Sequence, residues 1–520
     1  MKIIVSLAAL AFAYSSSVRA AQTACEDLTK LSLPRAEITE ARIVAKGEFA
    51  PPPGALGGPE TGAAYKALPS FCRVLATLRP SPDSDIKIEV WLPTEGWNGR
   101  LEGVGNGAFM SSIFYWNLAE AVSQGYAATA TNTGHEGNSG EFAFGHPEKL
   151  IDWGYRAVHE MTIAAKAIIT ARYGHPANHA YWNSCSTGGR EGLMEAENYP
   201  YDFDGLAVGD AANPMTRNQA STLYSTLAVN KDPAGFLSPA KWLAYRNAVV
   251  DKCDAADGVK DGLLSDPTAC KFDPKEMECK SGDRDDCLTP PQIVALNTVL
   301  AGMKNPRTGE QLHPGWPVGA NPNPTMVVGR EPEQVAIDTF RAVFQNPNWD
   351  YHTMDFDKDI ALSDKLGNRL MNAVDESRLK TLFGRGGKII LYHGWSDANI
   401  SALLGIKYYA DAVEANGGTS KTYNSIRLFM VPGMGHCGGG EGPNTFDKMK
   451  AITQWVEEGK APDRIIAVHA GSNETVVRSR PLCPYPQVAK YLGKGSSDEA
   501  GNFSCTTPQA PKLSRVNAHG

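Results

Sequence analysis

Short apolar runs alternate with helical patterns along the first third of the chain. The runs with β-type character are Ile86 to Leu92, Arg100 to Val104, Ala127 to Ala130 and Ala180 to Ser184. Before the last of these, apolar residues recur at helical spacing from Ala157 to Tyr173, and Gly174 stands where a helix C-cap is expected. Strands separated by helices form mainly parallel sheets, so the pattern predicts an α/β fold.

The residue composition changes between about Asn213 and Val374, where Pro, Gly, Asn and Asp are frequent. Beyond this segment the α/β pattern returns. It predicts strands at Lys388 to Tyr392 and Ile426 to Val431, and an amphipathic helix from Phe446 to Glu458. We therefore predict one α/β domain built from residues 21–212 and 375–520, interrupted by an inserted domain of residues 213–374.

The first twenty residues are typical of an export signal. Lys2 supplies the basic region, Ile3 to Tyr14 is apolar, and Val18-Arg19-Ala20 has small residues at both recognition positions. A membrane anchor is the weaker interpretation, because the apolar run has 12 residues, whereas a spanning helix needs about 20. We expect residues 1–20 to be a signal peptide and the mature protein to reach the periplasm or the medium.

Composition narrows the classes of partner. Hydrophobic residues make up 42% of the 520 residues and charged residues 21%, which are ordinary values for a globular protein. Lys and Arg number 50 against 57 Asp and Glu, for a net charge of -7. The chain therefore has no excess of basic residues to neutralise the phosphate backbone of a nucleic acid, which argues against nucleic acid as a partner. No later segment is long and apolar enough to predict a membrane interaction.

The cysteine count indicates disulfide bonds, because ten is an even number and the chain carries an export signal. Spacing predicts three local pairs: Cys253 with Cys270, Cys279 with Cys287, and Cys483 with Cys505. The other four allow three pairings, which the spacing does not distinguish. These four are Cys25, Cys72, Cys185 and Cys437.

The residues Ser184-Cys185-Ser186-Thr187-Gly188 have the layout of a nucleophile elbow, in which a strand turns sharply into a helix and exposes one serine. The predicted strand before them and the helical pattern from Arg190 to Asn198 supply that context. Glycine is usual at the first position, where this chain has Ser184, so Gly188 and Gly189 are expected to relieve the crowding. An ordinary turn is the alternative interpretation.

A serine nucleophile needs an imidazole base and an acid that orients the imidazole. Asp397 follows the predicted strand at Lys388 to Tyr392, and His436 follows the strand at Ile426 to Val431. Each alone would more often be a solvated loop residue. The order Ser186, Asp397, His436, with each on a loop after a strand, is the order found in α/β-hydrolases.

Two of the unassigned cysteines flank these residues. Cys185 precedes Ser186 and Cys437 follows His436, so a bond between them would tie the nucleophile to the base, although both could instead be buried thiols or pair elsewhere. The Cys-Ser, Asp, His-Cys arrangement resembles the tannase and feruloyl esterase family, which includes the hydrolase of mono(2-hydroxyethyl) terephthalate. The resemblance covers most of the mature chain. It includes Trp97 to Arg100, Gly103 to Gly107, and Trp455 to Asp463.

The resemblance implies further assignments. It implies the Cys185–Cys437 bond, and we expect Cys25 and Cys72 to be disulfide-bonded as well.

An acyl-transfer site also needs amides aimed at the developing oxyanion, and these should be Gly107 and Thr187. Ala108 departs from the family pattern, because a second glycine is frequent there. Dinucleotide binding by the Gly-rich loop is discounted because the full spacing is absent.

An acidic loop lies in the predicted insert. Asp254, Asp257 and Asp261 place three carboxylates within eight residues, and these repel one another unless a hard cation lies between them. The spacing is not that of an EF-hand, and a solvated acidic turn is the alternative. The loop looks like the calcium loop of this family, which implies a structural Ca²⁺ held by these three side chains and by the carbonyls of Val259 and Leu263.

Together these features predict an α/β-hydrolase fold with a large inserted lid, in a secreted serine esterase that acts through a Ser-His-Asp triad and an acyl-enzyme. The expected substrates are small aromatic esters, either feruloyl (hydroxycinnamoyl) or galloyl. The alternatives are a terephthalate monoester hydrolase, which would use a lid arginine for the free carboxylate, and a calcium-dependent binding protein on an inactive scaffold. The candidate aromatic contacts are Trp316, Trp349 and Phe356, although residues of this kind are more often simply part of a core. The candidate arginines are Arg307, Arg330 and Arg341.

Overall fold

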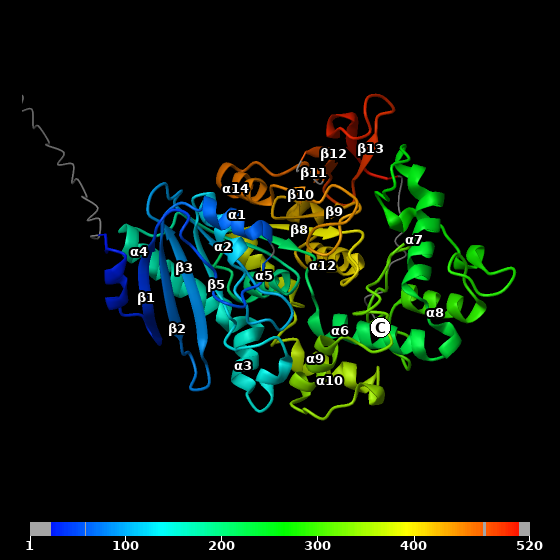
Figure 1. Cartoon of the computed structure of the whole chain (residues 1–520), viewed down its shortest axis with the longest axis horizontal. Helices are drawn as coiled ribbons and strands as arrows, with labels where there is room; N and C mark the ends of the chain where they lie inside the picture. Colours follow the sequence, from blue (N-terminus) through cyan, green and yellow to red (C-terminus); the bar gives the residue numbers. More distant parts are fainter. Residues whose placement is uncertain (1–21, 58, 472–474, 509–520) are drawn as a thin grey trace, which may run out of the picture.

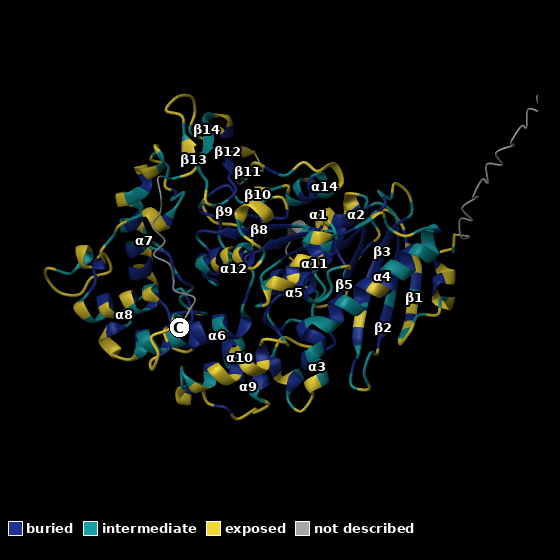
Figure 2. Ribbon diagram, turned by 180° about the vertical axis from the view of Figure 1, so that it is seen from behind, coloured by how far each residue is buried: buried dark blue, intermediate teal, exposed yellow. Residues whose placement is uncertain are grey.

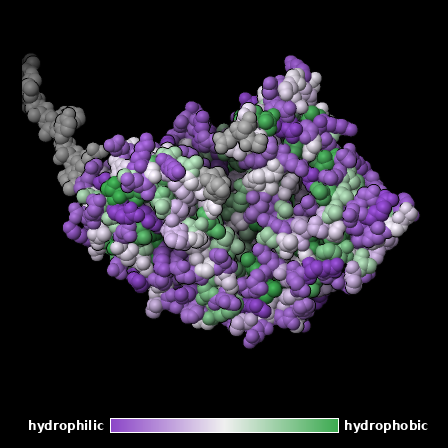
Figure 3. Space-filling model, in the orientation of Figure 1, coloured by the Kyte–Doolittle hydropathy of each residue, from purple (hydrophilic) through white to green (hydrophobic). Residues whose placement is uncertain are grey.

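The computed structural model describes residues 22–57, 59–471 and 475–508. The predicted signal peptide, residues 1–20, lies outside the described residues. None of the helices in the described ranges combines the length and the apolar character needed to cross a bilayer. The face shown in Figure 3 is mainly hydrophilic, with hydrophobic residues scattered in small patches.

A mixed β-sheet forms the centre of the fold (Figure 1). Its strands are β1 (Ala36–Val44), β2 (Phe71–Leu78), β3 (Ile86–Pro93), β4 (Arg100–Gly103), β5 (Ala127–Thr131), β6 (His179–Cys185), β7 (Gly205–Gly209), β8 (Lys388–Gly394) and β9 (Ile426–Val431). Among the described residues they pair in the order β1-β2-β3-β5-β4-β6-β7-β8-β9. All pairs from β5 through β4 to β9 are parallel, whereas β1, β2, β3 and β5 pair antiparallel. The mostly parallel sheet is therefore confirmed, and β1 and β2 extend it by an antiparallel edge.

Helices cover both faces of this sheet, and each face has its own apolar core. One face packs against α4 (Ala157–Tyr173), α5 (Thr187–Asn198) and α12 (Ala402–Ala415). The other packs against α2 (Tyr115–Ser123) and α14 (Lys448–Glu458). Figure 2 shows the central strands as buried between these layers, whereas β1 at the edge of the sheet has exposed positions. This arrangement of helix, sheet and helix is that of an α/β-hydrolase.

The long connection from β7 to β8 is helical. Its helices are α6 (Met215–Asn230), α7 (Pro239–Cys253), α8 (Pro290–Ala301), α9 (Gln334–Phe344), α10 (Lys358–Gly367) and α11 (Leu379–Gly384). Two apolar clusters outside the sheet hold α6 to α10 together, one around Trp242 and Leu296 and another around Phe340, whereas the buried residues of α11 belong to a core of the sheet. In Figure 1, α7 and α8 lie far from the first strands of the sheet. The exact domain boundaries, 212/213 and 374/375, stay a prediction.

The C-terminal part adds two small sheets. These are β10 (Thr445–Phe446), β11 (Ile465–Ala470) and β12 (Val476–Leu482), and the pair β13 (Val488–Tyr491) and β14 (Phe503–Thr506). The helix predicted from Phe446 begins two residues later, because Phe446 pairs with Ala467 in β10 and Asp447 caps the helix by accepting a hydrogen bond from the Lys450 amide (2.8 Å). Three short helices complete the fold: α1 (Pro59–Ala67), α3 (Pro147–Ile151) and α13 (Thr419–Thr422).

Candidate active site

Ser186 lies at the sharp turn between β6 and α5. Its backbone has φ 63° and ψ -126°, a conformation that a residue with a side chain adopts only when its surroundings enforce it. Two hydrogen bonds fix the turn: the Ser186 amide donates to the Gly209 carbonyl (3.0 Å), and the Ser186 carbonyl accepts from the Ala212 amide (3.1 Å). A Cβ on Gly188 would lie 1.9 Å from Ser184 Oγ, so a glycine is required there once a serine occupies position 184.

The structure brings Ser186, His436 and Asp397 together. Ser186 Oγ lies 2.9 Å from His436 Nε2, and His436 Nδ1 lies 2.8 Å from Asp397 Oδ2. The other oxygen of Asp397 accepts hydrogen bonds from the backbone amides of Asn399 (2.8 Å) and Ile400 (3.0 Å). These distances allow a proton to move from the serine to the imidazole while the carboxylate holds the ring.

The electrostatics of the site favour a charged imidazole. Burial alone would lower the pKa of His436, but the negative charge of Asp397 and the hydrogen bond to it outweigh burial and raise that pKa. Burial likewise opposes ionisation of Asp397, yet the two imidazoles of His436 and His393 hold its pKa well below the usual range. Asp397 is therefore a carboxylate that stabilises an imidazolium at His436.

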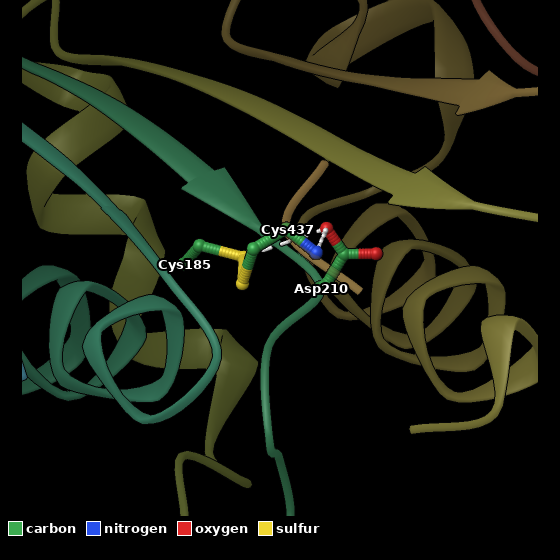
Figure 4. Close-up of side chains that lie close together, drawn as sticks. All are labelled: Cys185, Asp210 and Cys437. Atoms are coloured by element: carbon green, nitrogen blue, oxygen red, sulfur yellow. Dashed lines mark hydrogen bonds between the residues drawn. A yellow bond between two sulfur atoms is a disulfide. The ribbon is translucent and has the colours of Figure 1, made fainter. Parts of the chain in front are cut away.

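A second buried carboxylate, Asp210, supports the loop that carries His436. It follows β7, its side chain is fully buried, and it accepts hydrogen bonds from the amides of Gly394 (2.8 Å) and Cys437 (3.3 Å). Figure 4 shows it beside the disulfide between Cys185 and Cys437. Asp210 therefore links the ends of β7 and β8 to the histidine loop.

Asp210 is one of the residues near the triad that were not predicted from the sequence. Its carboxylate also lies 3.6 Å from His393 Nε2, and the nearby acid Asp397 lies 3.4 Å from the same atom. Burial raises the pKa of Asp210, and the two histidines only partly oppose this. An Asp directly after the apolar run Gly205 to Gly209 was the available signal, since Asp397 stands in a similar position after β8.

Among the described residues, neither of the two amides predicted to bind the oxyanion donates a hydrogen bond. Thr187 is the first residue of α5, and its amide has no acceptor among the described residues. The Gly107 amide likewise has none within the described ranges, while the Gly107 carbonyl accepts from Met110 (2.8 Å). Thr187 and Ala108, the neighbour of Gly107, both line the cavity that contains Ser186 and His436.

That cavity is lined by residues from the sheet edge, from α6 and from the segment before α9. The apolar lining residues are Ala212, Met215, Met326, Val327, Val335 and Ile400. The polar ones beside the triad are Asn218, Gln219, Thr222, Glu333 and Asn399. A larger cavity of about 1150 Å³ lies elsewhere in the insertion and includes neither Ser186 nor His436.

The aromatic side chains suggested from the sequence do not line the triad's cavity. Trp316 and Trp349 are buried in the two apolar clusters of the insertion, and Phe356 lines the larger cavity. These three predictions were wrong, because apolar rings on an insert that needs its own core are buried in that core.

The three candidate arginines are also absent from the triad's cavity. Arg307 pairs with Asp357 (2.6 Å), Arg341 donates to the Trp349 carbonyl (3.1 Å), and Arg330 lies over the Phe236 ring (3.7 Å). Among the described lining residues, the side chains able to carry a charge are Glu333 and His436. The described wall therefore supplies no arginine for a free carboxylate.

The acidic loop folds back on itself in the insertion. The Asp254 carboxylate accepts from the amides of Asp261 (3.2 Å) and Gly262 (3.0 Å), and Asp257 accepts from the Val259 amide (3.1 Å). Burial, and then repulsion from Asp261 and Asp254, raise the pKa of Asp257. Arg480 also pairs with Asp261. A set of carboxylate and carbonyl oxygens, including those of Val259 and Leu263, fits Ca²⁺.

All five predicted disulfides are present. The pairs are Cys25–Cys72, Cys185–Cys437, Cys253–Cys270, Cys279–Cys287 and Cys483–Cys505, and none of the described cysteines is free. The bond between Cys253 and Cys270 spans the acidic loop, and the bond between Cys185 and Cys437 joins the residues next to Ser186 and His436.

Comparison with known proteins agrees with this geometry. The family model described as tannase and feruloyl esterase matches residues 72–506. An uncharacterized esterase of Xanthomonas campestris is 36% identical over 93% of this chain and 91% of its own, and the mono(2-hydroxyethyl) terephthalate hydrolase of Piscinibacter sakaiensis is 32% identical over 86% of each. The crystal structure of feruloyl esterase B from Aspergillus oryzae superimposes with a TM-score of 0.85 at 28% identity, over 93% of this chain and 99% of that one.

The fold and these similarities define a carboxylic ester hydrolase with an α/β-hydrolase core. The chain belongs to the tannase and feruloyl esterase family. The fold class, the family and the enzyme class expected from the sequence are thereby confirmed.

Proposed function

We propose that this protein is an exported serine esterase that hydrolyses hydroxycinnamoyl or galloyl esters. The observation that carries the proposal is the continuous hydrogen-bonded chain from Ser186 Oγ through His436 to Asp397, opening on a cavity under the insertion. Five disulfides support export, because such bonds persist outside the reducing cytosol.

The mechanism follows from the positions of these atoms. His436 Nε2 takes the proton from Ser186 Oγ as the oxygen attacks the ester carbonyl, and the Asp397 carboxylate stabilises the imidazolium. The amides of Gly107 and Thr187 donate to the oxyanion. The imidazolium then gives its proton to the departing alcohol, which leaves an acyl-enzyme. Water repeats the sequence, releasing the acid and restoring Ser186.

Two alternatives have less support. A calcium-dependent binding protein would not need the intact Ser186, His436 and Asp397 chain. A terephthalate monoester hydrolase is favoured by the similarity to the Piscinibacter enzyme, but the described cavity wall lacks an arginine.

Rates of hydrolysis of methyl ferulate, methyl gallate and monomethyl terephthalate test the proposal. We expect the first or second ester to be hydrolysed fastest. Preference for the terephthalate monoester would contradict the assignment, as would failure to hydrolyse any of the three.

We also propose that the disulfide between Cys185 and Cys437 serves catalysis by fixing the distance between nucleophile and base. The loop-entropy model gives this bond a stabilising effect of about 5 kcal/mol. A displacement of about 1 Å between reacting groups can cost about a hundredfold in rate. Replacing both cysteines with alanine should therefore lower kcat by one to two orders of magnitude at a temperature where circular dichroism shows the folded state.

The matched control is the double alanine variant of Cys279 and Cys287, a disulfide of the insertion whose residues are separated by eight positions. That variant should keep kcat near the wild-type value. Equal kcat in both double variants would show that the disulfide between Cys185 and Cys437 has no catalytic effect.

Ca²⁺ bound by Asp254, Asp257 and Asp261 would hold the acidic loop without taking part in the reaction. A ligand that binds the native state raises stability by mass action, so chelation should lower Tm. Asp257→Ala should lower Tm in calcium-containing buffer and remove the response to chelator, whereas Asp251→Ala, an exposed position on α7, should do neither. Elemental analysis that finds no calcium in wild-type protein purified with calcium would refute the site.

A further inference from the structure

Polar side chains form one side of the cavity beside the triad. Met215, Asn218, Gln219 and Thr222 recur at positions i, i+3, i+4 and i+7 of α6, so they share one face of the helix. Asn218, Gln219 and Thr222 are only 6%, 7% and 6% exposed. A polar face of this kind is expected to point to solvent, yet here it faces the cavity.

These buried polar groups have few partners within the protein. Gln219 Nε2 lies 3.8 Å from Met215 Sδ, a weak contact. Within the described ranges, the side chains of Asn218 and Thr222 make no hydrogen bond to another protein group. The polar atoms of Asn218, Gln219 and Thr222 are not among the fully buried unpartnered atoms of the described residues, so they stay accessible from the cavity that these residues line. Their capacity to donate and accept hydrogen bonds is therefore available to a bound molecule.

Glu333 completes this side of the cavity. It stands at the N-cap of α9, but its side chain makes no capping hydrogen bond. Across the described residues its carboxylate has no hydrogen bond or ion pair, and the charged group that acts on it is His436. Burial raises the pKa of Glu333, and His436 opposes that effect. The carboxylate is therefore a free acceptor close to the reacting atoms.

We propose that Glu333 and the polar face of α6 form a subsite for the phenolic hydroxyl groups of the acyl part of the ester, and that Glu333 discriminates against acyl groups with a free carboxylate. The proposal rests on the proposed function. A phenolic O–H donates to the Glu333 carboxylate, while the amides of Asn218 and Gln219 and the Thr222 hydroxyl meet further oxygens on the ring. The apolar side chains of Met215, Val327 and Val335 contact the ring itself.

The charge of Glu333 gives the same subsite its second property, discrimination against acyl groups with a free carboxylate. A carboxylate on the substrate would lie near Glu333 in a partly desolvated cavity, where like charges repel more strongly than in water. No lysine or arginine among the described lining residues offsets this repulsion. The subsite is thus suited to hydroxylated, uncharged aromatic acyl groups.

The test compares kcat/KM within matched pairs of methyl esters. Methyl 4-hydroxycinnamate and methyl cinnamate differ by one hydroxyl, and monomethyl and dimethyl terephthalate differ by one charge. In Glu333→Gln, the preference for the hydroxylated ester should fall about ten- to a hundredfold, because a hydrogen bond to a charged acceptor is replaced by one to a neutral amide. The ratio of monomethyl to dimethyl terephthalate should rise.

Ratios of kcat/KM within one variant cancel the effect that loss of the Glu333 charge has on His436, because hydrolysis of all four esters depends on the same base. Glu331→Gln is the matched control: Glu331 accepts a hydrogen bond from Tyr351 (2.6 Å) and lines the larger cavity, so both ratios should stay at the wild-type values. Unchanged ratios in an active Glu333→Gln variant would overturn the subsite. A wild-type enzyme inactive on all these esters would instead overturn the proposed function.

Discussion

Replacing Ser186 with alanine is expected to lower kcat on aromatic methyl esters by about a millionfold, to the background left by binding and the oxyanion amides. The hydroxyl is the attacking group, and it lies 2.9 Å from His436 Nε2, which takes its proton. Loss of one oxygen removes few contacts, so Tm should stay within about 2 °C of the wild-type value. Initial rates and a thermal melt on the same preparation measure both quantities.

Ser496→Ala, in an exposed turn near the C-terminal sheets, is the control for expression and handling. Its rate should equal that of the wild type. An alanine variant of Ser186 that keeps more than a few per cent of the wild-type rate would show that another residue is the nucleophile.

Asp397→Asn should lower kcat by about ten thousandfold, because the amide favours the wrong imidazole tautomer and no longer stabilises the imidazolium. The pH profile supplies a second readout. His436 must be neutral to accept the proton, and Asp397 raises the pKa of His436 above the ordinary 6.5. In the wild type, kcat/KM should therefore rise with pH through a pKa above 6.5, and in Asp397→Asn the residual activity should rise through a lower one.

The control for this change is Asp463→Asn, because the Asp463 side chain is 87% exposed and pairs with Arg427 away from the triad. It should alter neither kcat nor the acid limb of the profile. If Asp397→Asn kept the wild-type acid limb, the carboxylate that raises the pKa of His436 would have to be another one, and Asp210 would be the candidate.

Most of the central strands could be predicted from their apolar runs, although β7 was not among the strands predicted from the sequence. The strand β9 has the predicted bounds Ile426–Val431, and the helix α4 has the predicted bounds Ala157–Tyr173. The strands near the antiparallel edge of the sheet were harder to predict. Arg73 interrupts the apolar run of β2 and is tolerated because it pairs with Glu89 on β3 (2.5 Å), a long-range contact that no local pattern reveals.

The triad could be predicted for a different reason. Ser186, Asp397 and His436 follow the carboxyl ends of the parallel strands β6, β8 and β9, and parallel strands bring those ends to one edge of the sheet. Asp210 occupies an equivalent place after β7. Nothing local distinguishes the acid that holds the histidine from the acid that supports its loop, because that difference depends on side-chain direction.

The wall of the cavity could not be predicted at all. Asn218, Gln219 and Thr222 look like a solvated helix face in the sequence, and only the packing of α6 over the sheet edge buries them. Glu333 stands at the N-cap position of α9 without making a capping hydrogen bond, and nothing in the local sequence marks it as a cavity residue. Specificity residues of this kind depend on the relative placement of an insertion and a core, which sequence periodicity does not encode.

Labelling with a fluorophosphonate probe, followed by peptide mapping of the adduct, tests the central claim most directly. Such a probe reacts with a serine only when a neighbouring base activates it. We expect one adduct per chain, located on Ser186, with loss of esterase activity in proportion to labelling and no adduct in Asp397→Asn on the same time scale. An adduct on a different residue, or full esterase activity in protein that the probe does not label, would contradict the account.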